Sequence, residues 1–271
     1  MAAQSKAPEA ALLDELVAIA RDAGAEILRL VEAGFEIETK ADASPVTVCD
    51  RAAEAVILAA LARVAPDVPV VAEEEAAAGR IPDHGATWFL VDPLDGTREF
   101  VSGGDDYTVN IGLIVDGAPR LGVVYQPAVD RLWGGLVGTG AFMEVGRVRT
   151  PIAARPLGVD RVAVASKSNF NSATGAYLAH VLGDCSHVAV GSSLKFCVVA
   201  EGRADLYPRL SPTCEWDTAA GHAVLLAAGG RVDALDGAPL RYGKPRFFNP
   251  GFVATGDWQA PAAAAFGEGL G

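Results

Sequence analysis

The N-terminal part of the chain has hydrophobic positions at helical spacing. They recur from Ala10 to Ala33, and Gly34 follows as a residue type that commonly ends a helix. A second helical pattern runs from about Asp50 to Val64 and stops before Pro66, because proline cannot continue a helix. The sequence therefore predicts two helices before the first long strand.

Two shorter apolar runs follow and predict strands. Val68–Ala72 leads into an acidic turn, Glu73–Glu75, and Thr87–Val91 breaks off at Asp92–Pro93. Carboxylates thus stand at the carboxyl ends of both strands, where α/β sheets tend to place their ligands.

The rest of the chain has two contrasting patterns. Residues 107–137 are typical of a β-meander, with the hairpin dipeptide Asp116–Gly117 between the first two strands. Helices and strands alternate afterwards, up to a helix over Trp216–Ala228 that stops at Gly229–Gly230.

This change of pattern predicts two halves. Residues 1–150 form an N-terminal α+β half, and residues 151–271 form a C-terminal α/β half. The candidate site residues described below divide between them: the first half carries Glu73 and the Asp92–Thr97 motif, and the second carries Lys195 and Asp217.

Charge narrows the classes of function. The 271 residues include 22 Lys and Arg against 34 Asp and Glu, a formal net charge of −12. This balance argues against non-specific binding of nucleic acid, whose phosphates need Lys and Arg contacts. A small phosphorylated ligand is compatible with it if bound metal ions reverse the local field.

The sequence also lacks the usual marks of membrane, secreted and zinc proteins. No apolar run is long enough to span a membrane, and Met1–Pro8 lacks the basic start and apolar middle of a signal peptide. The 4 cysteines form no CxxC pair, so reduced thiols in a cytoplasm are the default expectation. Peripheral association with the inner membrane stays open, as does the choice between monomer and dimer.

The segment Asp92-Pro-Leu-Asp-Gly-Thr97 carries the strongest candidate chemistry. Pro93 forces an irregular turn, so that the carboxylates of Asp92 and Asp95 can converge. Gly96 lets the backbone approach a ligand closely. Carboxylate and main-chain oxygens are the ligands that Mg²⁺ prefers.

An ordinary surface turn is the competing interpretation, with Asp92 as a helix cap and Asp95-Gly96 as turn residues. Three other acidic positions weaken it, because Glu73–Glu75, Asp50 and Asp217 also stand at the ends of apolar elements. Each of them alone could be a solvated turn or an N-cap. Their joint occurrence favours a metal site.

Short motifs of distinctive amino-acid sequence are spread over the whole chain. They are Ser44-Pro-Val-Thr47 with Asp50, Val71-Ala-Glu-Glu74, Asp92-Pro-Leu-Asp-Gly-Thr97, Tyr107-Thr-Val-Asn110, Gly191-Ser-Ser-Leu-Lys-Phe196 and Trp216-Asp-Thr-Ala-Ala-Gly221. Together they resemble the inositol monophosphatase-like family of metal- and lithium-sensitive phosphatases. Arg98-Glu99-Phe100 and the Gly191–Phe196 run make the chain most similar to the bacterial 3'(2'),5'-bisphosphate nucleotidases of that family, which dephosphorylate adenosine 3',5'-bisphosphate to AMP.

The resemblance implies a set of metal ligands. Glu73, Asp92 and the main-chain carbonyl of Leu94 would hold the Mg²⁺ ion that activates the attacking water. Asp92, Asp95 and Asp217 would hold the ion that stabilises the leaving oxygen, and two or three ions are expected in all. Paired metals about 3.5–4 Å apart clamp both oxygens of an in-line displacement.

The resemblance also assigns the residues around the substrate. Thr97 would orient and deprotonate the water, with Asp50 behind it. Ser192, Lys195 and Arg209 would lie beside the nucleotide, where a lysine and an arginine suit a second phosphate. Lys195 as a helix-surface lysine, and Arg209 as an ordinary residue of a Pro208–Pro212 loop, are the competing interpretations. The expected substrate contacts are Glu73, Leu94, Asp95, Gly96, Thr97, Ser192, Lys195, Arg209 and Asp217.

One position departs from the family pattern. Relatives often carry a histidine just after a Ser-Arg-Ser-type strand end, whereas Ser166-Lys-Ser-Asn169 places an asparagine there. Recognition of the base is therefore left open.

The resemblance implies a layered αβαβα sandwich, an α/β fold of the sugar-phosphatase type, with the site between the halves. The leading expectation for function is a Mg²⁺-dependent phosphomonoesterase that hydrolyses adenosine 3',5'-bisphosphate, within sulfur metabolism. The alternatives are an inositol or other sugar monophosphatase and a non-catalytic, metal-loaded protein that binds phosphorylated ligands. The Asp50–Thr97 pair argues against the last, because a binding protein needs no water-activating relay.

Overall fold

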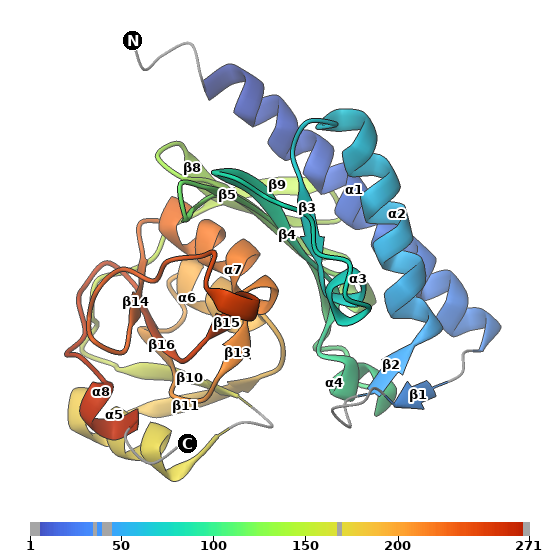
Figure 1. Cartoon of the computed structure of the whole chain (residues 1–271). Coiled ribbons are helices and arrows are strands. Elements are labelled where there is room, and N and C mark those ends of the chain that lie inside the picture. The colour runs from blue at the N-terminus through green and yellow to red at the C-terminus, as the bar shows by residue number, and fades with distance from the viewer. Residues whose placement is uncertain (1–5, 35–36, 40–44, 167–169, 268–271) are drawn as a thin grey trace.

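The computed structural model describes residues 6–34, 37–39, 45–166 and 170–267. Helices and sheets alternate in layers, in the order helix, sheet, helix, sheet, helix (Figure 1). This arrangement confirms the predicted αβαβα sandwich. The α-helices are α1 (Lys6–Ala33), α2 (Val48–Val64), α3 (Glu73–Ala77), α4 (Thr97–Val101), α5 (Ser172–Leu182), α6 (Leu194–Ala200), α7 (Trp216–Ala227) and α8 (Ala264–Gly267).

The larger sheet has seven strands and contains the predicted meander. In spatial order they are β3 (Val70–Ala72), β4 (Thr87–Asp95), β5 (Thr108–Val115), β6 (Ala118–Gln126), β7 (Arg131–Leu136), β8 (Gly140–Val145) and β9 (Val148–Ile152). β3 runs parallel to β4, and the other neighbours are antiparallel. The apolar face of α1 and α2 packs on one side of this sheet, and α7 packs on the other.

The smaller sheet has five strands and lies beyond α6 and α7. Its spatial order is β11 (Ser186–Val190), β10 (Val162–Ser166), β12 (Leu206–Arg209), β16 (Phe252–Thr255) and β14 (Arg231–Ala234). α5 and α8 form the last layer outside it (Figure 1). Two-stranded ladders pair β1 (Ile37–Thr39) with β2 (Pro45–Thr47), and β13 (Thr213–Cys214) with β15 (Phe248–Asn249).

A row of glycines crosses the larger sheet beneath α7. Gly112, Gly122 and Gly135 are paired in register on β5, β6 and β7. A Cβ atom added at Gly122 would lie 2.4 Å from the Ala220 carbonyl oxygen of α7, and one at Gly112 would lie 2.9 Å from Ala219. The glycines thus let α7 approach the sheet closely, and this approach sets the position of Asp217 at the start of the helix.

Local structure departs from the sequence expectation at two acidic segments. Thr47, and not Asp50, is the N-cap of α2, and Asp50 completes a capping box with it as the third helical residue. The segment Glu73–Glu75 is not a turn but the start of α3. In both cases a short polar or acidic run forms a helix terminus because buried partners supply the hydrogen bonds.

The strand that carries the central motif is also longer than predicted. β4 does not stop at Asp92 but continues to Asp95, with an irregularity in its pairing to β5 between these two residues. The turn expected at Pro93 is therefore an irregularity within a strand. The side chains of Asp92 and Asp95 still leave the same strand end.

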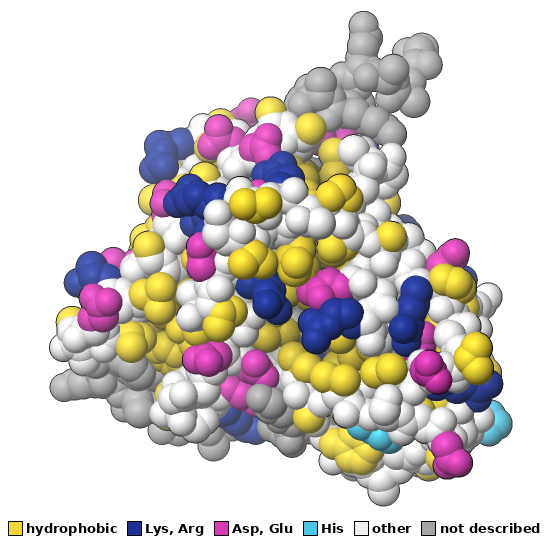
Figure 2. Space-filling view, turned by 180° about the vertical axis from the view of Figure 1, so that it is seen from behind, with side chains coloured by type: hydrophobic (Ala, Val, Ile, Leu, Met, Phe, Trp, Pro, Cys, Tyr) yellow, Lys and Arg dark blue, Asp and Glu magenta, His cyan; other side chains and the backbone are white. Residues whose placement is uncertain are grey.

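The division into halves stays a prediction. The predicted boundary between residues 150 and 151 falls inside β9, the last strand of the larger sheet, and β10 of the smaller sheet begins at Val162. α7, however, comes from the C-terminal half and packs on the N-terminal sheet. Among the described helices, none combines the length and apolarity needed to cross a membrane. Lys and Arg side chains on the face in Figure 2 are interspersed with acidic and apolar ones.

Candidate active site

The end of β4 places Asp92 in the interior. Its side chain is 2 % exposed, and its Oδ1 accepts a hydrogen bond from the Leu94 amide at 3.0 Å. Leu94 is 1 % exposed, and its carbonyl oxygen accepts a hydrogen bond from the Thr97 hydroxyl at 3.1 Å. The irregular strand end thus carries a buried carboxylate and a main-chain oxygen two residues apart in the sequence.

Thr97 opens α4 and faces the start of α2. Its Oγ1 lies 3.4 Å from Oδ1 of Asp50, which is 2 % exposed. The other carboxylate oxygen of Asp50 accepts bonds from the amide and hydroxyl of Thr47, both at 2.8 Å. The capping box therefore fixes the Asp50 carboxylate so that its Oδ1 faces Thr97. The sequence reading that paired Asp50 with Thr97 predicted this proximity.

Gly96 joins the two halves at the site. Its φ of +91° is a left-handed conformation that favours glycine. An added Cβ atom would lie 2.7 Å from the Asp106 carbonyl oxygen and 3.3 Å from Cβ of Ser192. The turn that carries Ser192 therefore packs directly against the motif.

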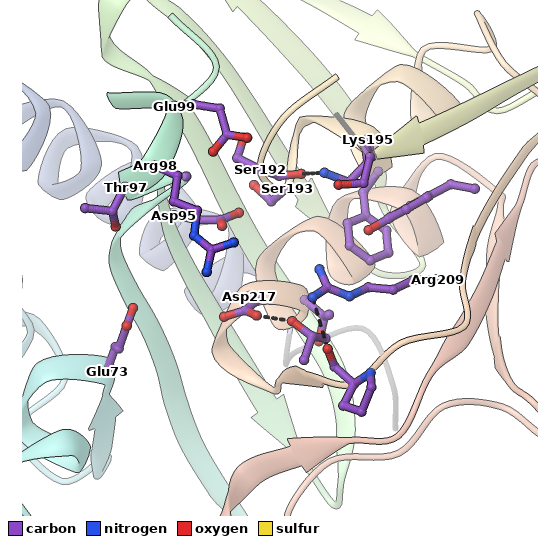
Figure 3. Close-up of a pocket in the computed structure, with 17 residues that line it drawn as sticks. Glu73, Asp95, Thr97, Arg98, Glu99, Ser192, Ser193, Lys195, Arg209 and Asp217 are labelled. Carbon is purple, nitrogen blue, oxygen red and sulfur yellow. Dashed lines mark hydrogen bonds between the residues drawn. The ribbon is translucent and has the colours of Figure 1, made fainter. Parts of the chain in front are cut away.

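The remaining carboxylates come from different layers. Asp217 lies in the first turn of α7, where one of its oxygens accepts bonds from the Thr213 hydroxyl and from the Cys214 amide at 3.1 Å. Glu73 is the first residue of α3. Figure 3 shows Asp95 and Asp217 facing the centre of the cavity, with Glu73 set apart at another wall.

The carboxylates repel one another in a buried setting. Burial is the largest cause that raises the pKa of Asp92 well above its ordinary value, and the charges of its acidic neighbours add to it. Burial, with the charge of Asp217, raises the pKa of Asp95 to about 7, although Lys195 and Arg209 oppose the shift. Burial also raises the pKa of Asp217. The site thus holds more negative charge than its own cations neutralise.

Two cations form the opposite wall. Lys195 is 3 % exposed and so is not a helix-surface lysine; its Nζ donates to the main-chain oxygens of Val190 and Ser192. Burial lowers its pKa to about 8, against the attraction of Asp95. Arg209 lies at the end of β12 and not in a loop, and its Nη2 donates to the Pro212 carbonyl at 3.0 Å. Figure 3 shows both side chains reaching the cavity from the same side.

These groups surround one cavity of about 440 Å³. It is lined by every predicted substrate contact except Leu94, while Asp50, Asp92 and Leu94 lie beneath its surface. Sequence reasoning did not assign several of its other lining residues, whose types carry no distinctive signal in isolation. They include Arg98, Ser166, Ser193, Phe196, Tyr207 and Thr213. Asn169 lies outside the described residues.

The donor set suits a hard divalent cation in its chemistry. Within the described part of the chain, no three His, Cys, Asp or Glu side chains are arranged to hold a metal ion as they stand. All the candidate donors are oxygens, which Mg²⁺ prefers, and a cation would relieve the repulsion that raises the pKa of Asp92 and Asp95. The chemistry of these oxygen donors therefore fits Mg²⁺, and the side chains would have to move closer together to bind the ion.

A layered sandwich whose cavity is lined by Asp95 and Asp217 together with Lys195 and Arg209 is the arrangement expected of a phosphatase of the sugar-phosphatase type. A model of the inositol monophosphatase family matches residues 9–267. The chain belongs to this family.

Individual members of the family resemble the chain to different degrees. The chain is 44% identical over 245 residues to the 3'(2'),5'-bisphosphate nucleotidase CysQ of Escherichia coli K12, covering 89% of this chain and 98% of that protein. It is 35% identical over 250 residues to the histidinol-phosphatase of Mycobacterium tuberculosis, covering 85% and 90%. The crystal structure of CysQ from Bacteroides thetaiotaomicron superposes with a TM-score of 0.78 at 35% identity, covering 92% of this chain and 98% of that one.

Proposed function

We propose that the protein is a Mg²⁺-dependent phosphomonoesterase that hydrolyses adenosine 3',5'-bisphosphate to AMP and phosphate. The observation that carries this proposal is the single cavity that places Lys195 and Arg209 opposite the buried carboxylates of β4 and α7. One wall suits the metals and the scissile phosphate, and the other suits a second phosphate. The 44% identity to a 3'(2'),5'-bisphosphate nucleotidase supports the same substrate class.

The metal ligands are Glu73, Asp92, the carbonyl of Leu94, Asp95 and Asp217. Bound Mg²⁺ supplies Lewis-acid stabilisation of the attacking and leaving oxygens. The chain contributes the oxygen donors and a buried floor, where the interaction between opposite charges is strong. The irregular end of β4 brings Asp92, Leu94 and Asp95 to this floor from one strand.

Thr97 and Asp50 move the proton of the attacking water. The Thr97 hydroxyl hydrogen lies between two acceptors, the Leu94 carbonyl oxygen at 3.1 Å and Oδ1 of Asp50 at 3.4 Å, and the hydroxyl oxygen can also accept a hydrogen bond from water. We expect the hydroxyl to donate to Asp50 when the Leu94 carbonyl is a metal ligand. As the water attacks, Thr97 takes its proton and passes its own to Asp50 Oδ1. The Thr47 bonds hold the other Asp50 oxygen in place throughout.

Lys195 and Arg209 select the substrate. Two of the three Lys195 donors are used by main-chain oxygens, which leaves one for a phosphate. Arg209 presents a planar fork that matches two phosphate oxygens. Gly96 and Ser192 keep the two walls in contact through the turn against the motif.

The proposal is tested by the ratio of kcat/KM for adenosine 3',5'-bisphosphate to that for inositol 1-phosphate. Lys195→Met keeps the buried stem and removes the charge, so the ratio should fall about tenfold or more, since a hydrogen bond to a charged group is worth about 1.5–3 kcal/mol. Arg203→Met is the control, because Arg203 pairs with Glu201 at the surface. If Lys195→Met lowers kcat/KM equally for both substrates, Lys195 binds the phosphate that they share. The protein would then be better described as a sugar monophosphatase.

A further inference from the structure

The buried face of α2 contains a carboxylate that the proposed reaction does not use. Glu54 is 4 % exposed and shares this face with the aliphatic residues Ile57 and Leu61. Burying a carboxylate is costly unless strong hydrogen bonds compensate for the lost water. A residue of this type among aliphatic neighbours therefore needs partners that justify its burial.

Both oxygens of Glu54 have such partners, and both partners belong to α3. Oε2 accepts a bond from the Glu74 amide at 2.8 Å, and Oε1 accepts one from the Glu75 amide at 3.0 Å. The first amides of a helix have no partner within the helix. The residue before α3 is Ala72, whose side chain cannot cap them. Glu54 thus caps α3 from another element of the fold.

The cap matters because of where Glu73 lies. On its N-terminal side, Ala72 is held in the β3 ladder opposite Val91 of β4. On its C-terminal side, the Glu74 amide is held by Glu54. A helix of five residues has little stability of its own, so the strand and the Glu54 cap together hold the backbone on both sides of Glu73.

We propose that Glu54 is a positioning residue for the metal site, acting through α3 on Glu73. This inference rests on the proposed function, in which Glu73 is a metal ligand. Glu54 lies one helical turn after Asp50 on α2. The same helix therefore fixes two separate parts of the site: Asp50, which accepts the Thr97 hydroxyl proton, and the start of α3, which carries Glu73.

The test compares two equally buried carboxylates in the same half. Glu144 is 5 % exposed and accepts bonds from Arg21 and Arg149, and its strand β8 is separated from β3 by four strands of the sheet. Glu54→Ala and Glu144→Ala should both lower Tm in EDTA. Only Glu54→Ala should weaken Mg²⁺ binding by isothermal titration, by about 10–100-fold, the usual effect of removing a group that orients a metal ligand. Glu54→Gln, which keeps one acceptor oxygen, should bind Mg²⁺ with intermediate affinity.

Hydrogen exchange supplies a readout that needs neither metal nor turnover. In Glu54→Gln and Glu54→Ala the Glu74 and Glu75 amides should exchange at least tenfold faster than in the native protein, while the Val71 amide keeps its rate. Faster exchange with Mg²⁺ affinity within about twofold of native would overturn the inference and leave Glu54 as a structural cap. If the native protein binds Mg²⁺ but does not hydrolyse the bisphosphate, the proposed substrate fails and the role of Glu54 stands.

Discussion

The close approach of α7 to the larger sheet yields a prediction with a magnitude that follows from the structure. Gly122→Ala would place a Cβ atom 2.4 Å from the Ala220 carbonyl oxygen, whereas ordinary contacts begin at 3.4 Å. α7 must therefore move by about 1 Å, and this overpacking should cost about 1–3 kcal/mol of unfolding free energy. Because Asp217 lies at the start of α7, the same shift should lower kcat/KM, by as much as about 100-fold.

Urea unfolding and phosphate release measure the two effects on one preparation. Gly175→Ala, in α5, is the matched control, because among the described residues its Cβ atom would meet the Phe170 ring alone, at an ordinary contact distance of 3.6 Å. That change should stabilise the protein by up to about 1 kcal/mol and leave turnover unaltered. A Gly122→Ala protein as stable and as active as the native one would refute the argument that the glycine row sets the position of Asp217.

Three further predictions concern the metals and the pH dependence of stability. Asp92→Asn should lower kcat by more than about 100-fold, beyond the usual effect of groups outside the ligand set. In EDTA it should raise the unfolding free energy, because it removes a buried carboxylate whose pKa is raised by burial and by acidic neighbours. Near-native turnover at saturating Mg²⁺ would disprove the role of Asp92 as a ligand shared by both ions. Ca²⁺ should inhibit in competition with Mg²⁺, because it prefers more ligands at longer distances, and equal turnover with either ion would contradict the proposed site. His222 is neutral in the fold, since burial and then Lys244 lower its pKa to about 3. Stability should therefore be complete above pH 6.5 and fall below it, as the unfolded chain takes up a proton, by about 1.4 kcal/mol per pH unit. Between pH 6.5 and 5, the unfolding free energy measured with urea should fall less steeply in His222→Gln than in the native protein, by about 1.4 kcal/mol per pH unit. Equal slopes in the two proteins would show that His222 titrates normally.

The sequence predicted the layered fold, which the structure confirms, and most of the predicted site residues line one cavity. Asp92 and Asp95 could be recognised because Pro93 restricts the backbone between them, and Gly96 allows the left-handed conformation that follows. The pairing of Asp50 with Thr97 was expected from the family resemblance, and the structure places the two side chains 3.4 Å apart. The metal and substrate roles of these residues stay predictions.

The errors arose where distant contacts decide local structure. Glu73–Glu75 was predicted as a turn, but Glu54, about 20 residues earlier on another helix, caps it into α3. Arg209 was placed in a Pro208–Pro212 loop, but β12 pairs with β16 through this residue. Lys195 could not be distinguished from a surface lysine, since its burial depends on Tyr207 and the turn at Ser192.

The most direct test of the account is phosphate release from adenosine 3',5'-bisphosphate, inositol 1-phosphate and histidinol phosphate by the purified protein, in Mg²⁺ and after its removal with EDTA. We expect the highest kcat/KM on the bisphosphate, because it alone offers a second phosphate to Lys195 and Arg209, and no turnover in EDTA. Turnover that persists without Mg²⁺, or a higher kcat/KM on either monophosphate than on the bisphosphate, would contradict the account.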